Sequence, residues 1–303
     1  MAAVSFLAKA RTGGKNEIEK CVIYSAPGGG KSTAAASFPK PIFLPIEDGL
    51  VALPHVARYD NDGKPWTWEL VNGGVLDELV QVAGPKCPYK TLVIDTADAL
   101  EPLCWEFTCR HNYEGKIWKS IESPGWGKGY GAALTTWRGF YARLEKIALK
   151  GMNIVVLAHS QVETFKNPKG PDFHRWQLKM DKKAAALLFE SFSDVFFLQE
   201  ENTVSVEKDT LSGRQRSRVR GGGVRFAYTT TQEGQFAKHR KGLPHRFEVP
   251  DPRIQSFYDT LLAERAAFLA GEPEEGEEGE EPAAEPVSEK APEAEEPAET
   301  EAT

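Results

Sequence analysis

A glycine-rich turn followed by a lysine and a serine is the first group of residues in this chain that could do chemistry. The apolar run 21–24 leads into the turn 25–30, and the small residues 33–36 come after Lys31 and Ser32. This order predicts a strand, a turn and a helix. Glycines allow successive backbone N–H groups to point at one phosphate without a Cβ in the way. Lys31 can then reach the β- and γ-phosphates of a nucleotide, and Ser32 can ligate Mg²⁺.

The predicted phosphate-binding residues form one unbroken stretch. They are Ser25, Ala26, Pro27, Gly28, Gly29, Gly30, Lys31, Ser32 and Thr33. The start of the predicted helix would add the positive end of its dipole to the bound anion. The usual pattern opens with glycine, and Ser25 stands at that position here. Because the later glycines and Lys31 are the residues nearest the β-phosphate, we expect the turn to accept this change.

A carboxylate at the end of another apolar run is the second reactive feature. Residues 91–94 form a largely apolar run, and Asp95 and Thr96 follow it. An unpaired charge at the end of a buried strand is unfavourable unless it has a partner or a role. We expect Asp95 to hold Mg²⁺ through its water shell, opposite Ser32.

Hydrolysis also needs a group that orients the attacking water. In many ATPases a Glu directly after the metal-binding Asp does this, but Thr96 occupies that position here. Glu47 follows the apolar run 42–46 and is the favoured candidate, with Asp48 as the alternative. If the strand before Glu47 neighbours the strand that ends at Asp95, Glu47 would face the γ-phosphate from the carboxyl edge of the sheet, where α/β sheets bind ligands.

The elements expected around these residues would bring them to one edge of a sheet. The apolar runs lack the alternation of half-buried strands, which is typical of strands covered on both faces in parallel sheets. Beyond the first, they cover 42–46, 91–95 and 153–159, and helices are expected at 97–112, 130–150 and 254–270. Short segments at 195–198, 203–206 and 224–228 predict antiparallel strands. The predicted fold class is α/β, with a mostly parallel central sheet flanked by helices and an antiparallel C-terminal extension.

Charge is distributed unevenly along the chain. Residues 271–303 hold 14 Glu and one Lys and carry a net charge of −13, whereas the whole chain carries −7 and the first 270 residues therefore +6. Such a tail cannot bury a core, so we expect a lead-in over 1–17, a globular domain over 18–270 and a disordered acidic tail over 271–303. Four cysteines without metal-ligand spacing, and no apolar run of membrane-spanning length, favour a cytoplasmic protein with no membrane contact.

Two stretches between these elements combine aromatic and basic residues. Residues 112–131 contain Tyr113, Lys116, Trp118, Lys119, Trp126, Lys128 and Tyr130, and residues 160–181 contain Phe165, Lys166, Lys169, Phe173, His174, Arg175, Trp176 and Lys179. On loops such residues suit single-stranded nucleic acid, because cations follow the phosphates and rings stack on the bases. Packing of the same rings against the core is the alternative for each stretch.

The order of these groups resembles that of RecA-like ATPases. The resemblance rests on the glycine turn, Glu47 after the second strand, Asp95 after the third, and a polar residue, His159, at the end of the fourth. It implies that His159 couples the γ-phosphate to a DNA-binding loop behind it, with Gln161 as the rival for that role. The two aromatic and basic stretches fall where this family has its two DNA-binding loops.

The segment 236–244 is similar to a Lys-x-Arg-x-Gly segment of RecA-like hexameric helicases and related phage ATPases. In those proteins the Lys and Arg reach across a subunit interface to the γ-phosphate of the neighbour. The resemblance therefore implies that Lys238 and Arg240 act in trans on the ATP of an adjacent subunit.

The resemblance extends over about residues 18–250 and is strongest to small phage nucleotide-binding proteins, some of which anneal single strands. It implies an ATPase with ATP and Mg²⁺ as cofactors that binds single-stranded DNA and acts in phage-type recombination or annealing. It further implies a homo-oligomeric ring or filament with ATP at the subunit interface, a single-strand binding protein as a partner, and the bacterial host cytoplasm as location. The alternatives are a RecA-like helicase or helicase loader, and a P-loop kinase or nucleotide switch without a DNA role.

Overall fold

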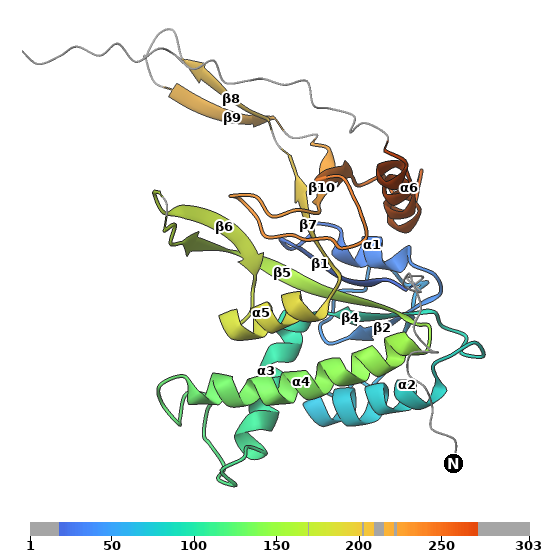
Figure 1. Cartoon of the computed structure of the whole chain (residues 1–303), viewed down its shortest axis with the longest axis vertical. Helices are drawn as coiled ribbons and strands as arrows, with labels where there is room; N and C mark the ends of the chain where they lie inside the picture. The colour runs from blue at the N-terminus through green and yellow to red at the C-terminus, as the bar shows by residue number, and fades with distance from the viewer. Residues whose placement is uncertain (1–17, 169, 202, 209–214, 221–222, 272–303) are drawn as a thin grey trace, which may run out of the picture. The chain divides into compact units, whose positions relative to one another are not determined.

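The computed structural model of the chain describes residues 18–168, 170–201, 203–208, 215–220 and 223–271 (Figure 1). The expected lead-in over 1–17 and the acidic tail from residue 272 onward lie outside them.

One large sheet of nine strands forms the centre of the described part (Figure 1). Its order is β11-β10-β7-β1-β5-β4-β2-β3, with β6 paired to β5 outside this path. The parallel strands are β1 (Lys20–Ser25), β2 (Pro41–Pro45), β3 (Ala57–Arg58), β4 (Thr91–Asp95), β5 (Asn153–Phe165) and β7 (Asp194–Glu200). The antiparallel strands are β6 (Phe173–Leu178), β10 (Arg225–Tyr228) and β11 (Arg246–Glu248). This arrangement confirms the predicted fold class.

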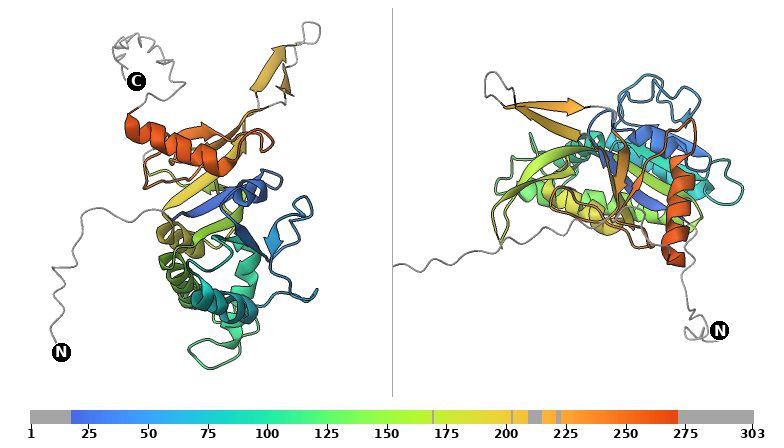
Figure 2. Two further views of the ribbon diagram at one scale, coloured as in Figure 1. Left: turned by 90° about the vertical axis from the view of Figure 1, so that its right-hand side faces the viewer. Right: turned by 90° about the horizontal axis from the view of Figure 1, so that it is seen from above.

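Helices cover both faces of the sheet, which explains why the strands read as continuous apolar runs. Val22 and Tyr24 of β1 face one apolar layer, whereas Cys21 and Ile23 face the other. The first layer is completed by α2 (Leu76–Val82), α3 (Ala97–Arg110), α4 (Lys128–Leu149) and α5 (Lys182–Ser191), and the second by α1 (Lys31–Ala36) and α6 (Phe257–Ala270). Figure 2 shows α1 and α6 on the same side of the sheet. Alternate residues of a strand point to opposite faces, so both sets must be apolar.

Aromatic residues hold α4 against its neighbours. Trp137 and Phe140 project from α4, and both rings pack against Trp68, with ring centroids 5.3 and 5.4 Å from it. Trp68 stands just before the π-helical turn Leu70–Val75 that leads into α2. The helix expected over 130–150 therefore forms as α4 and places one apolar face in the core.

The register brings the expected chemical groups to one edge. Ser25 of β1 pairs with His159 of β5, and Asp95 of β4 pairs with both Leu157 of β5 and Pro45 of β2. In a parallel sheet the carboxyl ends of the strands meet at the same edge, so the residues that follow β1, β2, β4 and the sheet portion of β5 are neighbours there.

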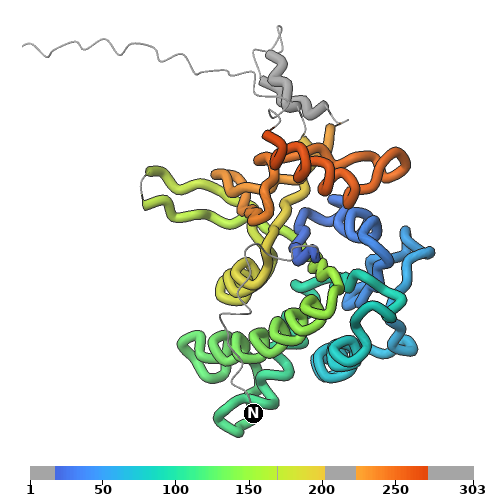
Figure 3. Tube along the Cα trace, turned by 45° about the vertical axis from the view of Figure 1, so that its right-hand side comes forward, coloured from blue at the N-terminus to red at the C-terminus, as the bar shows by residue number. Residues whose placement is uncertain are grey.

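Two expectations about the second half of the chain are wrong. Residues 160–178 do not form a loop: β5 continues to Phe165 and pairs with β6 in a hairpin, which projects from the body in Figure 3. Residues 160–165 read polar, polar, apolar twice over and lack the strict alternation of a half-buried strand, so the sequence alone does not mark this extension. In addition, residues 195–198 lie in β7, which runs parallel to β1 and not antiparallel as expected. The strands β8 (Thr203–Lys208) and β9 (Gln215–Arg220) pair only with each other, whereas β10 and β11 form the antiparallel extension of the central sheet.

The four cysteines are buried free thiols, as expected for reduced cysteines. Within the described part of the chain, no helix has both the length and the apolar composition needed to cross a membrane.

Candidate active site

The glycine turn curls tightly over its own first residue. Gly28 and Gly30 have φ values of 76° and 89°, in the left-handed region that favours glycine. A Cβ on Gly29 would lie 2.2 Å from Ser25 Oγ, so the fully buried serine fills the space beneath Gly29. The Ser25 hydroxyl also donates to the Ala26 carbonyl at 2.8 Å. Ser25 is therefore compatible with the turn, because the glycine above it leaves room for its side chain.

Lys31 points into this turn rather than outward. Its Nζ lies 3.5 Å from both oxygens of Ser25 and 3.4 Å from the Ala26 carbonyl oxygen, and the residue is 6 % exposed. Burial lowers the pKa of the Lys31 ammonium, while the nearby carboxylates, led by Asp95, oppose that shift. The ammonium is thus held inside the turn, where a bound phosphate would be its neighbour.

Ser32 and Asp95, the two residues predicted to hold Mg²⁺, are in direct contact. The Ser32 hydroxyl donates to Asp95 Oδ2 at 2.9 Å, and Asp95 is 2 % exposed. Burial raises the pKa of Asp95 to about 6, and the Glu47 carboxylate adds to the rise, against the Ser32 hydrogen bond and the Lys31 and His159 charges.

These two residues fit Mg²⁺. One carboxylate and one hydroxyl are hard oxygen donors, which Mg²⁺ prefers. The raised pKa of Asp95 means that the surrounding cations do not fully compensate its buried charge, and a divalent cation would do so.

Glu47 lies close to this pair, as expected from neighbouring strands. The Glu47 backbone N–H donates to the Asp95 carbonyl, because β2 pairs with β4. A Cβ placed on Gly49 would lie 3.9 Å from both Asp95 Oδ2 and Glu47 Oε1, so both carboxylates flank that glycine. Asp48 is exposed, which favours Glu47 as the group that faces the site.

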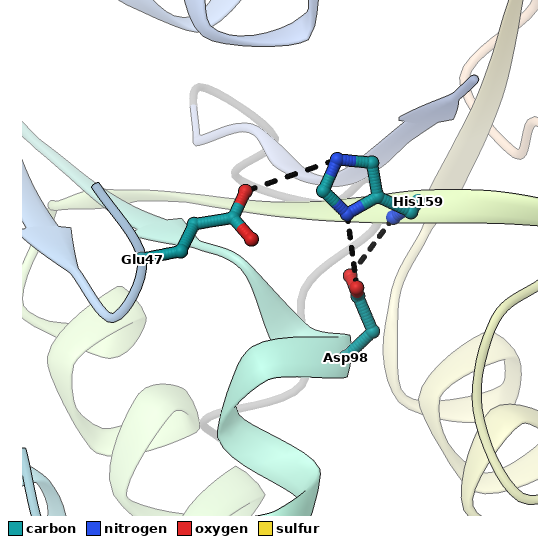
Figure 4. Close-up of side chains that lie close together, drawn as sticks. All are labelled: Glu47, Asp98 and His159. Carbon is teal, nitrogen blue, oxygen red and sulfur yellow. Dashed lines mark hydrogen bonds and ion pairs between the residues drawn. The ribbon is translucent and has the colours of Figure 1, made fainter. Parts of the chain in front are cut away.

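His159 stands between two carboxylates, Glu47 and Asp98 (Figure 4). Its backbone N–H donates to Asp98 Oδ1 at 2.9 Å, and its ring Nδ1 lies 2.9 Å from Asp98 Oδ2. Its Nε2 lies 3.8 Å from Glu47 Oε1. Because an ionised carboxylate can only accept, Asp98 selects the form of the imidazole in which Nδ1 carries the proton, and it fixes the plane of the ring.

Asp98 is a site residue that the sequence reasoning missed. It lies in the first turn of α3, whose N-cap Thr96 accepts a hydrogen bond from the Ala99 N–H. The only local signal was its position three residues after Asp95, at the start of a helix. Its partner His159 is 61 residues away, so the contact depends on the pairing of β4 with β5.

Glu47, Asp98 and His159 could also hold a cation among themselves, since each offers a ligand atom and these atoms lie within 4.8 Å of one another. Two of the three are already hydrogen-bonded to each other, and one ligand is a nitrogen. Ser32 and Asp95 therefore remain the better Mg²⁺ ligands.

Lys238 and Arg240 lie away from the glycine turn of their own chain. The Lys238 backbone pairs with Val195, which is in register with Val22 near the start of β1, and its Nζ donates to the Phe189 carbonyl. The Arg240 N–H donates to Asp194 Oδ1 at 3.0 Å, and its side chain is exposed. Both residues are thus near the amino edge of the sheet, and the structure does not bring them to the turn within one chain.

The chain is similar to one protein family and to solved structures. A family model described as an AAA domain matches residues 18–241, and no curated protein matches the chain. Among solved structures, the chain is similar to the flagellar accessory protein FlaH from Methanocaldococcus jannaschii. That alignment has 9 % identity and a TM-score of 0.34, and covers 82 % of this chain and 92 % of that one.

Proposed function

The chain belongs to the AAA domain family, whose phosphate loop makes it a nucleotide hydrolase in general terms, and on that premise we propose a Mg²⁺-dependent ATPase that acts on single-stranded DNA in phage-type recombination or annealing. The observation that carries the proposal is the convergence of Lys31, the Ser32–Asp95 pair and the Glu47–His159 pair around the glycine turn. These are the parts that phosphoryl transfer to water requires.

Each part has a distinct task in the proposed reaction. The turn N–H groups and Lys31 bind the β- and γ-phosphates, and Ser32 and Asp95 would hold Mg²⁺, which supplies charge neutralisation when bound. Glu47 accepts a hydrogen bond from the attacking water and orients it in line with the γ-phosphate. His159, held by Asp98, places its Nε2 3.8 Å from Glu47 Oε1, beside the carboxylate that orients the water.

The β5–β6 hairpin supports a link between hydrolysis and DNA. His159 is the residue of β5 paired with Ser25, and the hairpin begins directly after it. On the hairpin, the Arg175 guanidinium lies 4.3 and 5.1 Å from the ring centroids of Phe165 and Phe173. A cation stacked with two rings is a surface that can bind both a phosphate and a base. A shift of this hairpin on DNA binding would move His159.

The segment between α3 and α4 is the second region that supports DNA binding. Trp126 is 99 % exposed, and Tyr113 and Lys116 are exposed near it in sequence, whereas Trp118 is buried and anchors the segment to the core. A fully exposed indole is unfavourable in water alone and suits stacking on unpaired bases.

The oligomer is the part of the proposal that Arg240 supports. Its exposed side chain is carried on a segment that a buried ion cluster anchors: Lys241 and Arg265 both pair with Glu19, at 3.0 and 2.6 Å. A rigid segment of this kind can present Arg240 to the ATP of a neighbouring subunit in a ring or filament. Lys238 already donates to the Phe189 carbonyl in its own chain, so Arg240 is the better candidate for the contact in trans.

The test is the rate of ATP hydrolysis with Mg²⁺ in the presence and absence of single-stranded DNA. We expect single-stranded DNA to stimulate the rate, and Trp126→Ala to remove that stimulation without changing the basal rate. Ile254→Ala is the matched control, because Ile254 is an exposed apolar residue (85 %) outside the proposed surface. A rate that does not respond to DNA contradicts the DNA role. Annealing and unwinding assays on the same samples separate an annealing protein from a helicase.

A further inference from the structure

Arg225 is an arginine that the fold delivers to the glycine turn of its own chain. It is the first residue of β10, which runs antiparallel to β7, and it pairs with Glu200 at the end of β7. The start of an antiparallel strand lies at the carboxyl edge of its parallel neighbour, which is the edge where the turn lies. Its backbone is held from the other side as well, since the Arg225 carbonyl accepts from the Val249 N–H at 2.7 Å.

The guanidinium of Arg225 lies against Gly30. A Cβ on Gly30 would be 2.6 Å from Arg225 Nη1 and 3.3 Å from Cζ, so any side chain there would displace the guanidinium. Gly30 is the residue directly before Lys31, within the stretch expected to hold the β-phosphate. Glycine at this position therefore leaves room for the Arg225 guanidinium and also adopts the φ of 89°.

The Arg225 guanidinium has no anionic partner among the described residues. Within the described residues the guanidinium makes no hydrogen bond or ion pair, although it is half-buried, and Glu200 opposite it in register does not pair with it. The carboxylates that act on Lys31 are Asp95, Glu47 and Asp98, on the other side of the turn. A guanidinium prefers bidentate contacts with phosphate or carboxylate oxygens, and the turn beside it is built of N–H donors.

From this geometry we propose that Arg225 binds phosphate oxygens of the nucleotide held in the turn of its own chain. Arg225 and Lys31 would then contact the phosphates from two sides. A cavity of about 240 Å³ adjoins the guanidinium, lined by the first half of the turn, by Ser160 and Trp176 of the hairpin and by the end of β7, so ligand atoms can approach Arg225. The inference rests on the nucleotide site of the proposed function, but it requires neither DNA nor an oligomer.

The experiment compares Arg225→Gln and Arg225→Lys with the wild-type protein, using MgADP and inorganic pyrophosphate as probes. Arg253→Gln is the matched control, because Arg253 is exposed and pairs with Asp251 in a loop. We expect Arg225→Gln to lower the binding affinity for both probes by a similar factor of about 10 or more, which is the scale of one lost charge-assisted contact. Arg225→Lys should fall between, and Arg253→Gln should match the wild type. Adenosine, which has no phosphate, should compete with ADP equally well for binding to all four proteins.

Stability without ligand separates a binding role from a structural one. Arg225 has no partner to lose among the described residues, so Arg225→Gln should unfold at the same temperature as the wild type when no nucleotide is present. A clearly lower midpoint of thermal unfolding for Arg225→Gln overturns the proposal, since the arginine would then support the fold. Weaker binding of ADP with unchanged binding of pyrophosphate also overturns it, since the arginine would then contact the ribose or the base. Unchanged affinity of Arg225→Gln for both probes overturns this proposal but not the proposed function. A wild-type protein that binds neither probe overturns the proposed function as well.

Discussion

Replacing Asp95 by Asn should make the nucleotide-free protein more stable. The Asp95 carboxylate is buried at the end of β4, and burial raises its pKa to about 6. Asn has the same shape without the charge, and its oxygen can still accept the hydroxyl of Ser32, which lies 2.9 Å from Asp95 Oδ2. The substitution therefore removes a destabilising charge while it keeps the local hydrogen bond.

The size and sign of this effect follow from the pKa. The carboxyl has an ordinary value of 3.8 and a folded value of about 6, so between these values the folded chain binds more protons than the unfolded chain. Its contribution to stability is therefore lost as the pH rises through this window. At about 1.4 kcal/mol per pKa unit, the charged form costs about 3 kcal/mol at about pH 8 and about half of that at about pH 5.

The assay is thermal unfolding in EDTA, without nucleotide, at about pH 5 and about pH 8. A gain of about 3 kcal/mol corresponds to an increase of about 6–12 °C in the midpoint for a domain of this size, and the gain at the lower pH should be about half as large. Asp48→Asn is the control, because Asp48 is an exposed carboxylate close by in sequence. The reasoning is refuted if Asp95→Asn gains nothing at about pH 8, or gains the same at both pH values.

Three further predictions concern the hydrolysis reaction. Lys31→Ala should lower ATP turnover by about 100-fold or more, because it removes the cation at the phosphates, while circular dichroism shows an intact fold; turnover at the wild-type rate would mean that the turn is not the site. Glu47→Gln should bind ATP with wild-type affinity but lower kcat by about 100-fold or more, and a loss of ATP affinity instead would assign Glu47 a binding role. Asp98→Asn should lower kcat by about 10-fold with KM unchanged, because the amide can donate to Nδ1 and so reverses the proton position that Asp98 imposes on His159; an unchanged kcat would show that the orientation of the ring does not matter.

The linear order of the residues was enough for the glycine turn and for the strand ends. The turn, Lys31 and Ser32 are contiguous, and their chemistry is local to one strand, one turn and one helix. Asp95 was identified because a carboxylate at the end of a fully apolar strand is unusual. Glu47 needed one further assumption, that β2 and β4 are neighbours, and the sheet order meets it.

The β5–β6 hairpin shows where the sequence pattern was too weak to predict strands. Residues 160–165 read polar, polar, apolar twice over, without the strict alternation of a half-buried strand, and the mixture of basic and aromatic residues further on suggested a loop. Strand pairing with β6 satisfies the backbone of this segment, and a sequence without a partner strand in view does not reveal that pairing.

The sequence by itself identified the candidate phosphate and metal ligands, because those residues are adjacent along the chain or stand at the ends of apolar runs. Only the tertiary structure decided their partners. Asp98 meets His159 across 61 residues, and Arg225 meets Gly30 from the far end of the sheet. These contacts depend on strand order and on register, and a shift of one residue in a strand would turn each side chain to the opposite face. The residues of the glycine turn are therefore local in sequence, whereas the contacts of Asp98 with His159 and of Arg225 with Gly30 are properties of the assembled sheet.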